Sequence, residues 1–325
     1  MIERRTLAAV AAAFATAPAG AQQPADAGFP NRPMRLVVPF PPGGPNDAIG
    51  RVLAQKLSAL LGQPVVVENR SGGGGVVGTD AVAKAAPDGH TFAVTSAGAL
   101  AIAPSLVPSM PYQIGRDLAP VALVATVPEL LVVHPGVPAG TLAELVAHAK
   151  SRRDPLNYAS SGNGSMPHLA GESLRFAAGV ELVHVPYRGA APAVTDLVAG
   201  QVQMMFADLP VLLPQTRSGT LRPIALAAAE RSPLLPDVPT TAEAGLPQVR
   251  AENWYGMVVP ARTPEPALAA LRGATVRALR DPEVADALRE QGARAGGGPE
   301  DFAAFIRAEA ARWGEIARRS GATMD

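Results

Sequence analysis

The chain alternates short apolar, β-branched runs with segments in which apolar residues recur at helical spacing. Six such runs, MRLVVPF, PVVVEN, TFAVTS, LNYASS, LVHVPY and QMMFAD, each precede a loop and a helical pattern. Strands that alternate with helices favour right-handed crossovers and parallel sheets, and runs that are apolar on both faces are typical of buried parallel strands. The pattern predicts an α/β fold whose first helices lie at about 47–61 and 76–86.

Two places break this alternation. In PVALVATVPELLVVHPG, two apolar runs are separated only by Pro128 and Glu129, with no helix between them. The second break, ENWYGMVVPARTPEP, is followed only by helical patterns. We interpret each break as a crossing between domains. The sequence thus predicts one discontinuous α/β domain, 28–127 plus 255–325, and one inserted α/β domain, 128–254.

The N-terminus has the features of a cleavable export signal. Arg4 and Arg5 form a basic region, LAAVAAAFATA is a short apolar region, and Ala19 to Ala21 form a small-residue cleavage site. The apolar stretch is shorter than the ~20 residues that a membrane span needs. We expect cleavage near residue 21 and export to the periplasm, by the general or the twin-arginine route, and exclude residues 1–27 from the fold.

Composition narrows the function classes. A length of 325 residues suits two domains, and 28 basic residues balance 28 acidic ones, so no charge excess favours nucleic acid or an anionic membrane. The absence of cysteine excludes disulfides, thiolate metal sites and a cysteine nucleophile. Any anion must therefore be held locally.

A glycine-rich corner supplies such a local site. Backbone N–H groups at a helix N-terminus are unpaired and lie at the positive end of the helix dipole, and glycine lets an anion approach them. Gly43 and Gly44 stand at such a corner between flanking prolines, and Asp47 caps the helix or pins the loop.

The same arrangement recurs after three other runs. Residues 160–165 precede a helix that carries His168, Tyr187-Arg188-Gly189 precede another, and Thr95-Ser96-Ala97 end a third strand. Because ligands of parallel α/β sheets lie at the carboxyl ends of strands, we expect the corner at Gly43 to face the corner at 160–165 across a cleft. Such a cleft would hold a small carboxylate.

Three other interpretations fit the sequence less well. Gly73, Gly75 and Gly78 match a dinucleotide fingerprint by letters, but the next strand ends in Thr95-Ser96 and not in an acidic residue. A serine hydrolase would need G-x-S-x-G, and the residue two before Ser161 is alanine. The histidines are dispersed without the spacing of metal ligands. A secreted α/β enzyme acting on a small acid remains the alternative to a binding protein.

Six ordered motifs carry a resemblance to a known family: VVPFPPGGPND, VVVENRSGGGG, KAAPDGHTF, YASSGNGSMPHLAGE, VHVPYRGAAPAVTDLVAGQVQMMF and LPDVPTTAEAG. Together they closely resemble the receptors of tripartite tricarboxylate transporters, the TctC or Bug family. The resemblance runs from about Pro33 to the last helix. It implies a two-lobed periplasmic-binding-protein (Venus flytrap, type 2-like) fold without a cofactor, which captures a small carboxylate and delivers it to inner-membrane transporter subunits. We expect a monomer.

The resemblance also implies a site in which backbone N–H groups of residues 40–47 and of the loop 160–165 hold the carboxylate, with waters bridging to the sheet. One position departs from the family: many members have Asp-Asn after Met-Phe, whereas Ala207 and Asp208 follow Phe206 here. We expect Asp208 and Arg188 to set selectivity, while Tyr187 closes over the ligand or packs. The predicted binding residues are Phe40, Pro41, Gly43, Gly44, Asn46, Asp47, Thr95, Ser96, Ala97, Ser160, Ser161, Gly162, Asn163, Gly164, His168, Tyr187, Arg188, Gly189 and Asp208.

Overall fold

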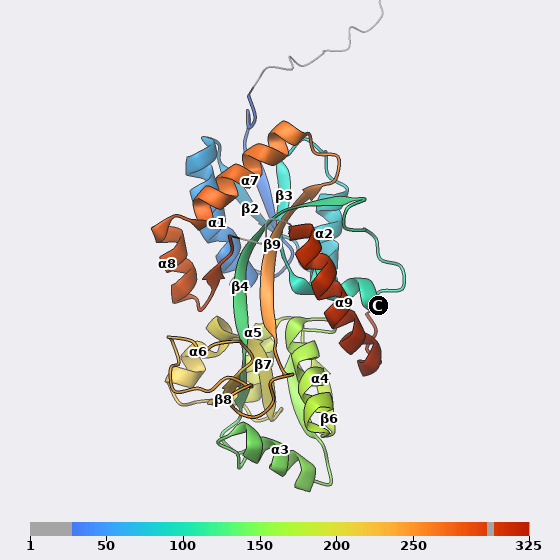
Figure 1. Cartoon of the computed structure of the whole chain (residues 1–325), viewed down its shortest axis with the longest axis vertical. Coiled ribbons are helices and arrows are strands. Elements are labelled where there is room, and N and C mark those ends of the chain that lie inside the picture. Colours follow the sequence, from blue (N-terminus) through green and yellow to red (C-terminus); the bar gives the residue numbers. More distant parts are fainter. Residues whose placement is uncertain (1–27, 298–301, 325) are drawn as a thin grey trace, which may run out of the picture.

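The computed structural model describes residues 28–297 and 302–324, so the predicted export signal lies outside the described residues. Two α/β lobes lie one above the other along the long axis of the molecule (Figure 1). The first contains β1 (Met34–Val38), β2 (Val65–Asn69), β3 (Thr91–Ser96), α1 (Pro45–Leu61), α2 (Val76–Ala83), α7 (Glu265–Leu279), α8 (Pro282–Glu290) and α9 (Phe302–Ser320). The second contains α3 (Leu142–Ser151), β5 (Leu156–Ser160), α4 (Met166–Ala178), β6 (Leu182–Pro186), α5 (Ala190–Val198), β7 (Met204–Asp208), α6 (Leu209–Arg217) and β8 (Arg222–Leu226).

Two long strands, β4 (Leu118–Val133) and β9 (Glu252–Pro260), join the lobes (Figure 1). The strand order is β2-β1-β3-β9-β4-β7-β5-β6, with β8 and the two-residue β10 (Arg294–Ala295) also pairing with β4. The part of β4 at 118–128 pairs with β9 in the first lobe, and 129–133 pairs with β7 and β8 in the second. The two apolar runs around Pro128 are thus a single strand that belongs to both lobes.

All six predicted strands are present and pair with one another in parallel, as predicted, but the antiparallel pairing of the two crossing strands was not foreseen. Pairs β1–β2, β1–β3, β5–β6 and β5–β7 are parallel, whereas β4 and β9 pair antiparallel to each other and to their other neighbours. The reason is that the chain leaves the first lobe along β4 and returns along β9 in the opposite direction. The expectation that only helices follow β9 is wrong, because β10 pairs with β4 there, and β8 was not predicted.

Helix boundaries follow local chemistry. Proline at the first position starts α1, and Gly62 ends it in the left-handed conformation. A capping box between Thr141 and Glu144 starts α3. The second helix ends at Ala83, three residues before the predicted end.

The last helix, α9, packs on the crossing strand β9. Trp254 and Trp313 are both fully buried, and both indole N–H groups donate to the carboxylate of Glu309, over 3.1 and 2.9 Å. Phe302 and Phe305 make edge-on contacts with Trp254. The C-terminal helix therefore braces the first lobe where β9 enters it. None of the described helices is both long and apolar enough to cross a membrane.

Candidate functional site

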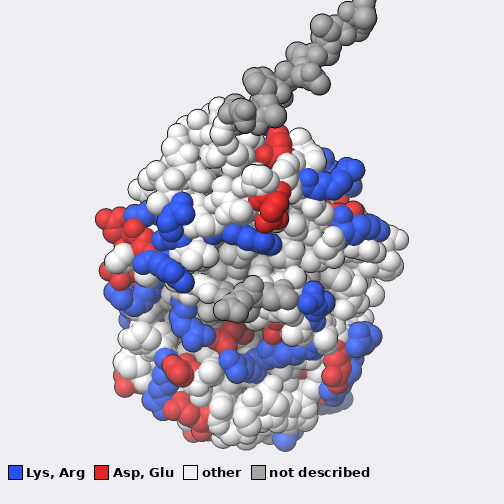
Figure 2. Space-filling model, turned by 45° about the horizontal axis from the view of Figure 1, so that its top comes forward, with Lys and Arg blue, Asp and Glu red and all other residues white. Residues whose placement is uncertain are grey.

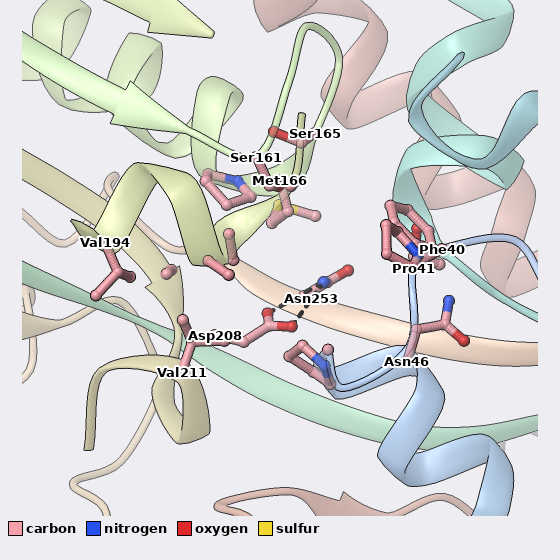
Figure 3. A pocket seen from close by; sticks show the side chains of 18 of the residues that line it. Phe40, Pro41, Asn46, Ser161, Ser165, Met166, Val194, Asp208, Val211 and Asn253 are labelled. Atoms are coloured by element: carbon pink, nitrogen blue, oxygen red, sulfur yellow. Dashed lines mark hydrogen bonds between the residues drawn. The ribbon is translucent and has the colours of Figure 1, made fainter. Parts of the chain in front are cut away.

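A cavity of about 670 Å³ lies between the lobes, where strand ends and helix starts of both meet (Figure 3). This is within the usual range for small-molecule sites, about 300–1,000 Å³. Ten of the predicted site residues line it: Phe40, Pro41, Gly43, Gly44, Asn46, Ser96, Ser161, Arg188, Gly189 and Asp208. The others do not line it: Asp47, Thr95, Ala97, Ser160, Gly162, Asn163, Gly164, His168 and Tyr187.

The first wall is the corner before α1. The carboxylate of Asp47 accepts hydrogen bonds from Gly43 N–H at 3.0 Å, from the Arg51 guanidinium at 2.9 Å and from the Asn69 amide at 2.8 Å. Burial alone would raise the pKa of Asp47, but these bonds hold it below its usual value. Asp47 thus pins the loop, and the backbone of Gly43 takes a left-handed φ of 84° that favours glycine.

The second wall is the loop before α4, and histidines hold it. His168 is buried and accepts a hydrogen bond on Nδ1 from Gly164 N–H, over 3.1 Å. Its ring stacks on His184 with centroids 3.8 Å apart, and His184 Nε2 lies 2.6 Å from Ser160 Oγ. Burial lowers the pKa of His168 to about 4 and that of His184 to about 3, the latter with help from His168. Both rings are therefore neutral at pH 7.

The third wall is the start of α5. Arg188, Gly189, Ala190 and Ala191 all line the cavity, and Arg188 is exposed. Tyr187 turns away, donating its hydroxyl to Asp196 over 2.7 Å. Together these positions bring a third helix N-terminus to the cavity.

Several backbone donors at these helix starts have no hydrogen-bond partner among the described residues. They are the N–H groups of Gly44 and Asn46 before and in α1, Ser161 and Met166 at α4, and Gly189, Ala190 and Ala191 at α5. Each residue also lines the cavity. Unpaired N–H groups at several helix N-termini make the cavity a site for an anion.

Charge on the surface does not explain anion binding. Figure 2 shows basic and acidic side chains interspersed over one face, in keeping with 28 residues of each sign in the chain. Among the described residues, no group of three histidines, aspartates or glutamates is arranged to hold a metal ion. The oriented peptide groups in the cavity are therefore the feature that can attract an anion.

The floor of the cavity contains residues that the sequence did not single out. Asn253 and Tyr255, from β9, line it, and Figure 3 shows Asn253 beside Asp208. Gly74 and Gly98 lie in contact with the loop before α4: a Cβ at Gly98 would be 3.4 Å from the Gly164 carbonyl oxygen. Because Asn253 lies in the crossing strand rather than at a glycine-rich corner, the search for corners missed it.

The Ser160–His184 pair has the short contact of a nucleophile and its base, but not the access. Ser160 has no exposed surface and does not line the cavity, and its hydroxyl also donates to the Gly162 carbonyl at 3.1 Å. The pair therefore serves to hold the loop.

The fold and the cavity define a two-lobed periplasmic binding protein with its ligand site between the lobes. The model of the tripartite tricarboxylate transporter family receptors matches residues 49–322, so the chain belongs to this family. Protein BugT of Bordetella pertussis is 40% identical, and the match covers 98% of each chain. A protein encoded in the tcbD–tcbE intergenic region of a Pseudomonas species is 42% identical over 96% of this chain and 93% of its own.

Solved structures agree. Rpa4515 of Rhodopseudomonas palustris, determined with adipate, is 37% identical with a TM-score of 0.85, covering 91% of this chain and 99% of its own. MatC of the same species, determined with malate, is 36% identical with a TM-score of 0.81, and the match covers 89% of this chain and 100% of MatC. The periplasmic binding protein BugD is 34% identical in sequence, its structure has a TM-score of 0.83, and the match covers 91% of this chain and 99% of BugD.

Proposed function

We propose that this chain is an exported receptor that traps a small organic carboxylate between its lobes and presents it to a tripartite tricarboxylate transporter. The observation that carries the proposal is the convergence of unpaired N–H groups from α1, α4 and α5 on one cavity. The adipate and malate in the two related structures support a carboxylate ligand.

The binding energy follows from these donors. A hydrogen bond to a charged group contributes about 1.5–3 kcal/mol, so several such bonds suffice for micromolar affinity, which corresponds to about −8 kcal/mol. The α1 wall belongs to one lobe and the α4 and α5 walls to the other, so a bound carboxylate bridges them. Closing the lobes around the ligand then creates the surface that the transporter recognises.

The proposal has further parts. The lobes correspond to 28–127 plus 255–325 and to 128–254, with β4 and β9 as the connection. The receptor acts as a monomer in the periplasm after removal of the export signal, and the transporter subunits contact the outer rims of both lobes. Phe40, Ser96 and Ser161, which line the cavity, contact the ligand, while Asp47 and His168 hold the two loops in place.

The receptor works without catalysis. Of the enzyme alternatives, a serine hydrolase would use Ser160 or Ser161; Ser160, which contacts His184, is completely buried, and Ser161 lines the cavity but forms no hydrogen bond with a histidine among the described residues. A hydrolase of this kind would consume its substrate, whereas a receptor returns it unchanged. Incubation of the protein with the organic acids described below, followed by chromatography, separates the two functions.

The decisive experiment replaces Gly43 with valine. A Cβ at Gly43 has no atom within 4 Å, so the new side chain would stand in the space that the ligand needs. Gly62→Val is the matched control, because Gly62 also has a left-handed φ and open space but ends α1 away from the cavity. In a thermal-shift titration with organic acids, we expect the wild type and Gly62→Val to be stabilised and Gly43→Val to show no shift. Full affinity in Gly43→Val would refute the site.

A further inference from the structure

The floor of the cavity carries a buried acidic side chain. Asp208 ends β7, lines the cavity and is 6% exposed. Its carboxylate accepts hydrogen bonds from the Asn253 amide at 3.0 and 3.3 Å and from the Tyr255 hydroxyl. Figure 3 shows this carboxylate beside Asn253, on the opposite side of the cavity from Phe40 and Asn46.

A second acid lies directly behind the first. Glu129 is the cross-strand partner of Asp208 in the β4–β7 pair and is completely buried. Neither of its carboxyl oxygens accepts a hydrogen bond from any N–H or hydroxyl group of the described residues. Two adjacent buried carboxyls cannot both be ionised at low cost, so the pair keeps a proton.

The surrounding donors decide where the proton resides. Burial, and then the charge of Asp208, raise the pKa of Glu129 well above its usual range. Burial also raises the pKa of Asp208, but the hydrogen bonds from Tyr255, Glu129 and Asn253 oppose that rise. Because Asp208 accepts the hydrogen bonds of Asn253 and Tyr255 and Glu129 accepts none, the surroundings favour the negative charge on Asp208 and the proton on Glu129.

This charge lacks a cation. No lysine, arginine or histidine of the described residues forms an ion pair with Asp208 or Glu129. Arg188, the basic residue of the lining, is exposed at the rim. A buried charge without a partner is costly, and a cation from outside would offset that cost.

A second, independent feature indicates that the cavity contacts polar groups of the ligand besides its carboxylate. Asn46 lines the cavity with only 3% of its surface exposed, and both its amide nitrogen and its amide oxygen lack a partner among the described residues. Buried polar atoms are normally satisfied, so unpaired ones in a ligand cavity indicate partners that the ligand or its waters supply.

We propose that Asp208 forms a subsite for a protonated nitrogen, so that the ligand of this receptor is an acid that also carries an ammonium group. The inference rests on the proposed function, since the helix N-termini hold the carboxylate end of the same molecule. A second carboxylate placed at Asp208 would meet a like charge in a desolvated site, which is unfavourable.

The test compares ligands that differ only at one end. In 6-aminohexanoate and 4-aminobutanoate, an aminomethyl group stands in place of one carboxyl group of adipate and succinate. Isothermal titration calorimetry at pH 7.5 should show at least tenfold tighter binding of one or both amino acids than of the matched diacid. This comparison uses the wild-type protein and so does not depend on whether any variant folds.

Two variants test whether the preference for the amino acid over the diacid arises from Asp208 or from Glu129. Asp208→Asn keeps the shape and an acceptor for Tyr255 but removes the charge, and it should abolish the preference for the amino acid. Glu129→Gln reproduces the neutral carboxyl and should keep the preference. Asp154→Asn, an exposed aspartate in the loop after α3, controls for the loss of one negative charge.

The outcomes separate this inference from the function on which it rests. If neither amino acid binds at least tenfold more tightly than its matched diacid while any of these acids binds, the ammonium subsite is overturned and the carboxylate receptor is left intact. An unchanged preference in Asp208→Asn would likewise overturn the assignment to Asp208. Absence of binding by every acid of both series, together with no thermal shift from other organic acids, would overturn both proposals.

Discussion

The corners before α1 and α4 face the same cavity, yet the protein holds them by different chemistry. An ionised carboxylate pins the α1 corner: Asp47 binds Gly43 N–H, Arg51 and Asn69. Neutral imidazoles hold the α4 corner: His168 binds Gly164 N–H, and His184 contacts Ser160. Both arrangements leave backbone donors free for an anion, but they respond to acid in different pH ranges.

The difference teaches how a loop can be fixed beside an anion site. An acceptor is needed behind each loop, because its N–H groups must be oriented without adding positive charge that would compete for the ligand. A carboxylate does this where Arg51 and Asn69 can balance it at the surface. In the interior of the second lobe, stacked neutral histidines serve instead, since burying a charge there would cost more.

The largest expected effect is a loss of stability in acid that comes from the second lobe. The folded-state pKa of His168 is about 4 and that of His184 about 3, both below the usual 6.5. The two histidines contribute fully to the free energy of unfolding above pH 6.5, and this contribution falls as the pH drops towards 4. The reason is that the unfolded chain binds protons that the native one does not. The loss is up to about 1.4 kcal/mol per pH unit for each histidine.

Urea unfolding at pH 7, 5.5 and 4.5 measures this loss. His168→Phe keeps an aromatic ring in the stack but does not titrate. The free energy of unfolding of this variant should therefore fall less steeply with decreasing pH than that of the wild type between pH 6.5 and 4.5. Asp47 does not contribute in this range, because a depressed carboxyl pKa affects stability only below its usual value of 3.8. Equal slopes in the two proteins would contradict the role of His168.

The second largest effect is expected from a substitution that removes the support of the corner before α1. Asp47→Ala leaves the Gly43 N–H without its acceptor in a partly buried site, and the Asn69 amide keeps only the Phe40 carbonyl as an acceptor. We expect a loss of about 2–3 kcal/mol in the free energy of unfolding, measured in urea at pH 7, and at least tenfold weaker binding of whichever acid stabilises the wild type. A variant with normal affinity would show that the prolines alone keep the corner in place.

The smallest effect sharpens the comparison within the α1 corner. Arg51 is about half exposed, with 53% of its side chain accessible, and Asp47 keeps its two other donors without it. Arg51→Ala should therefore lower the free energy of unfolding far less than Asp47→Ala and leave binding within threefold of the wild type. A loss as large as that of Asp47→Ala would mean that the ion pair, rather than the loop hydrogen bonds, fixes the corner.

Much of the fold and site could be predicted from local patterns. Apolar β-branched runs gave the six strands, and nine of the ten predicted residues that line the cavity belong to the expected corners, Gly43 and Ser161 among them, whereas Asp208 was singled out from the resemblance. These predictions worked because strand, corner and helix start are encoded by consecutive residues. The antiparallel course of β4 and β9, and the pairing of β8 and β10 with β4, depend on partners far away in the chain and were missed.

The sequence by itself determined the class of protein: alternating strands and helices, bare peptide groups at several helix starts, and the ordered motifs of a transporter receptor. Only the tertiary structure decided which residues meet across the lobes. Asp208, Glu129 and Asn253 lie in three separate strands, and His168 and His184 stack across a helix and a strand. Such groupings arise because strand register and helix packing bring distant residues together in low-dielectric surroundings, where protonation and charge depend on neighbours that no local pattern contains.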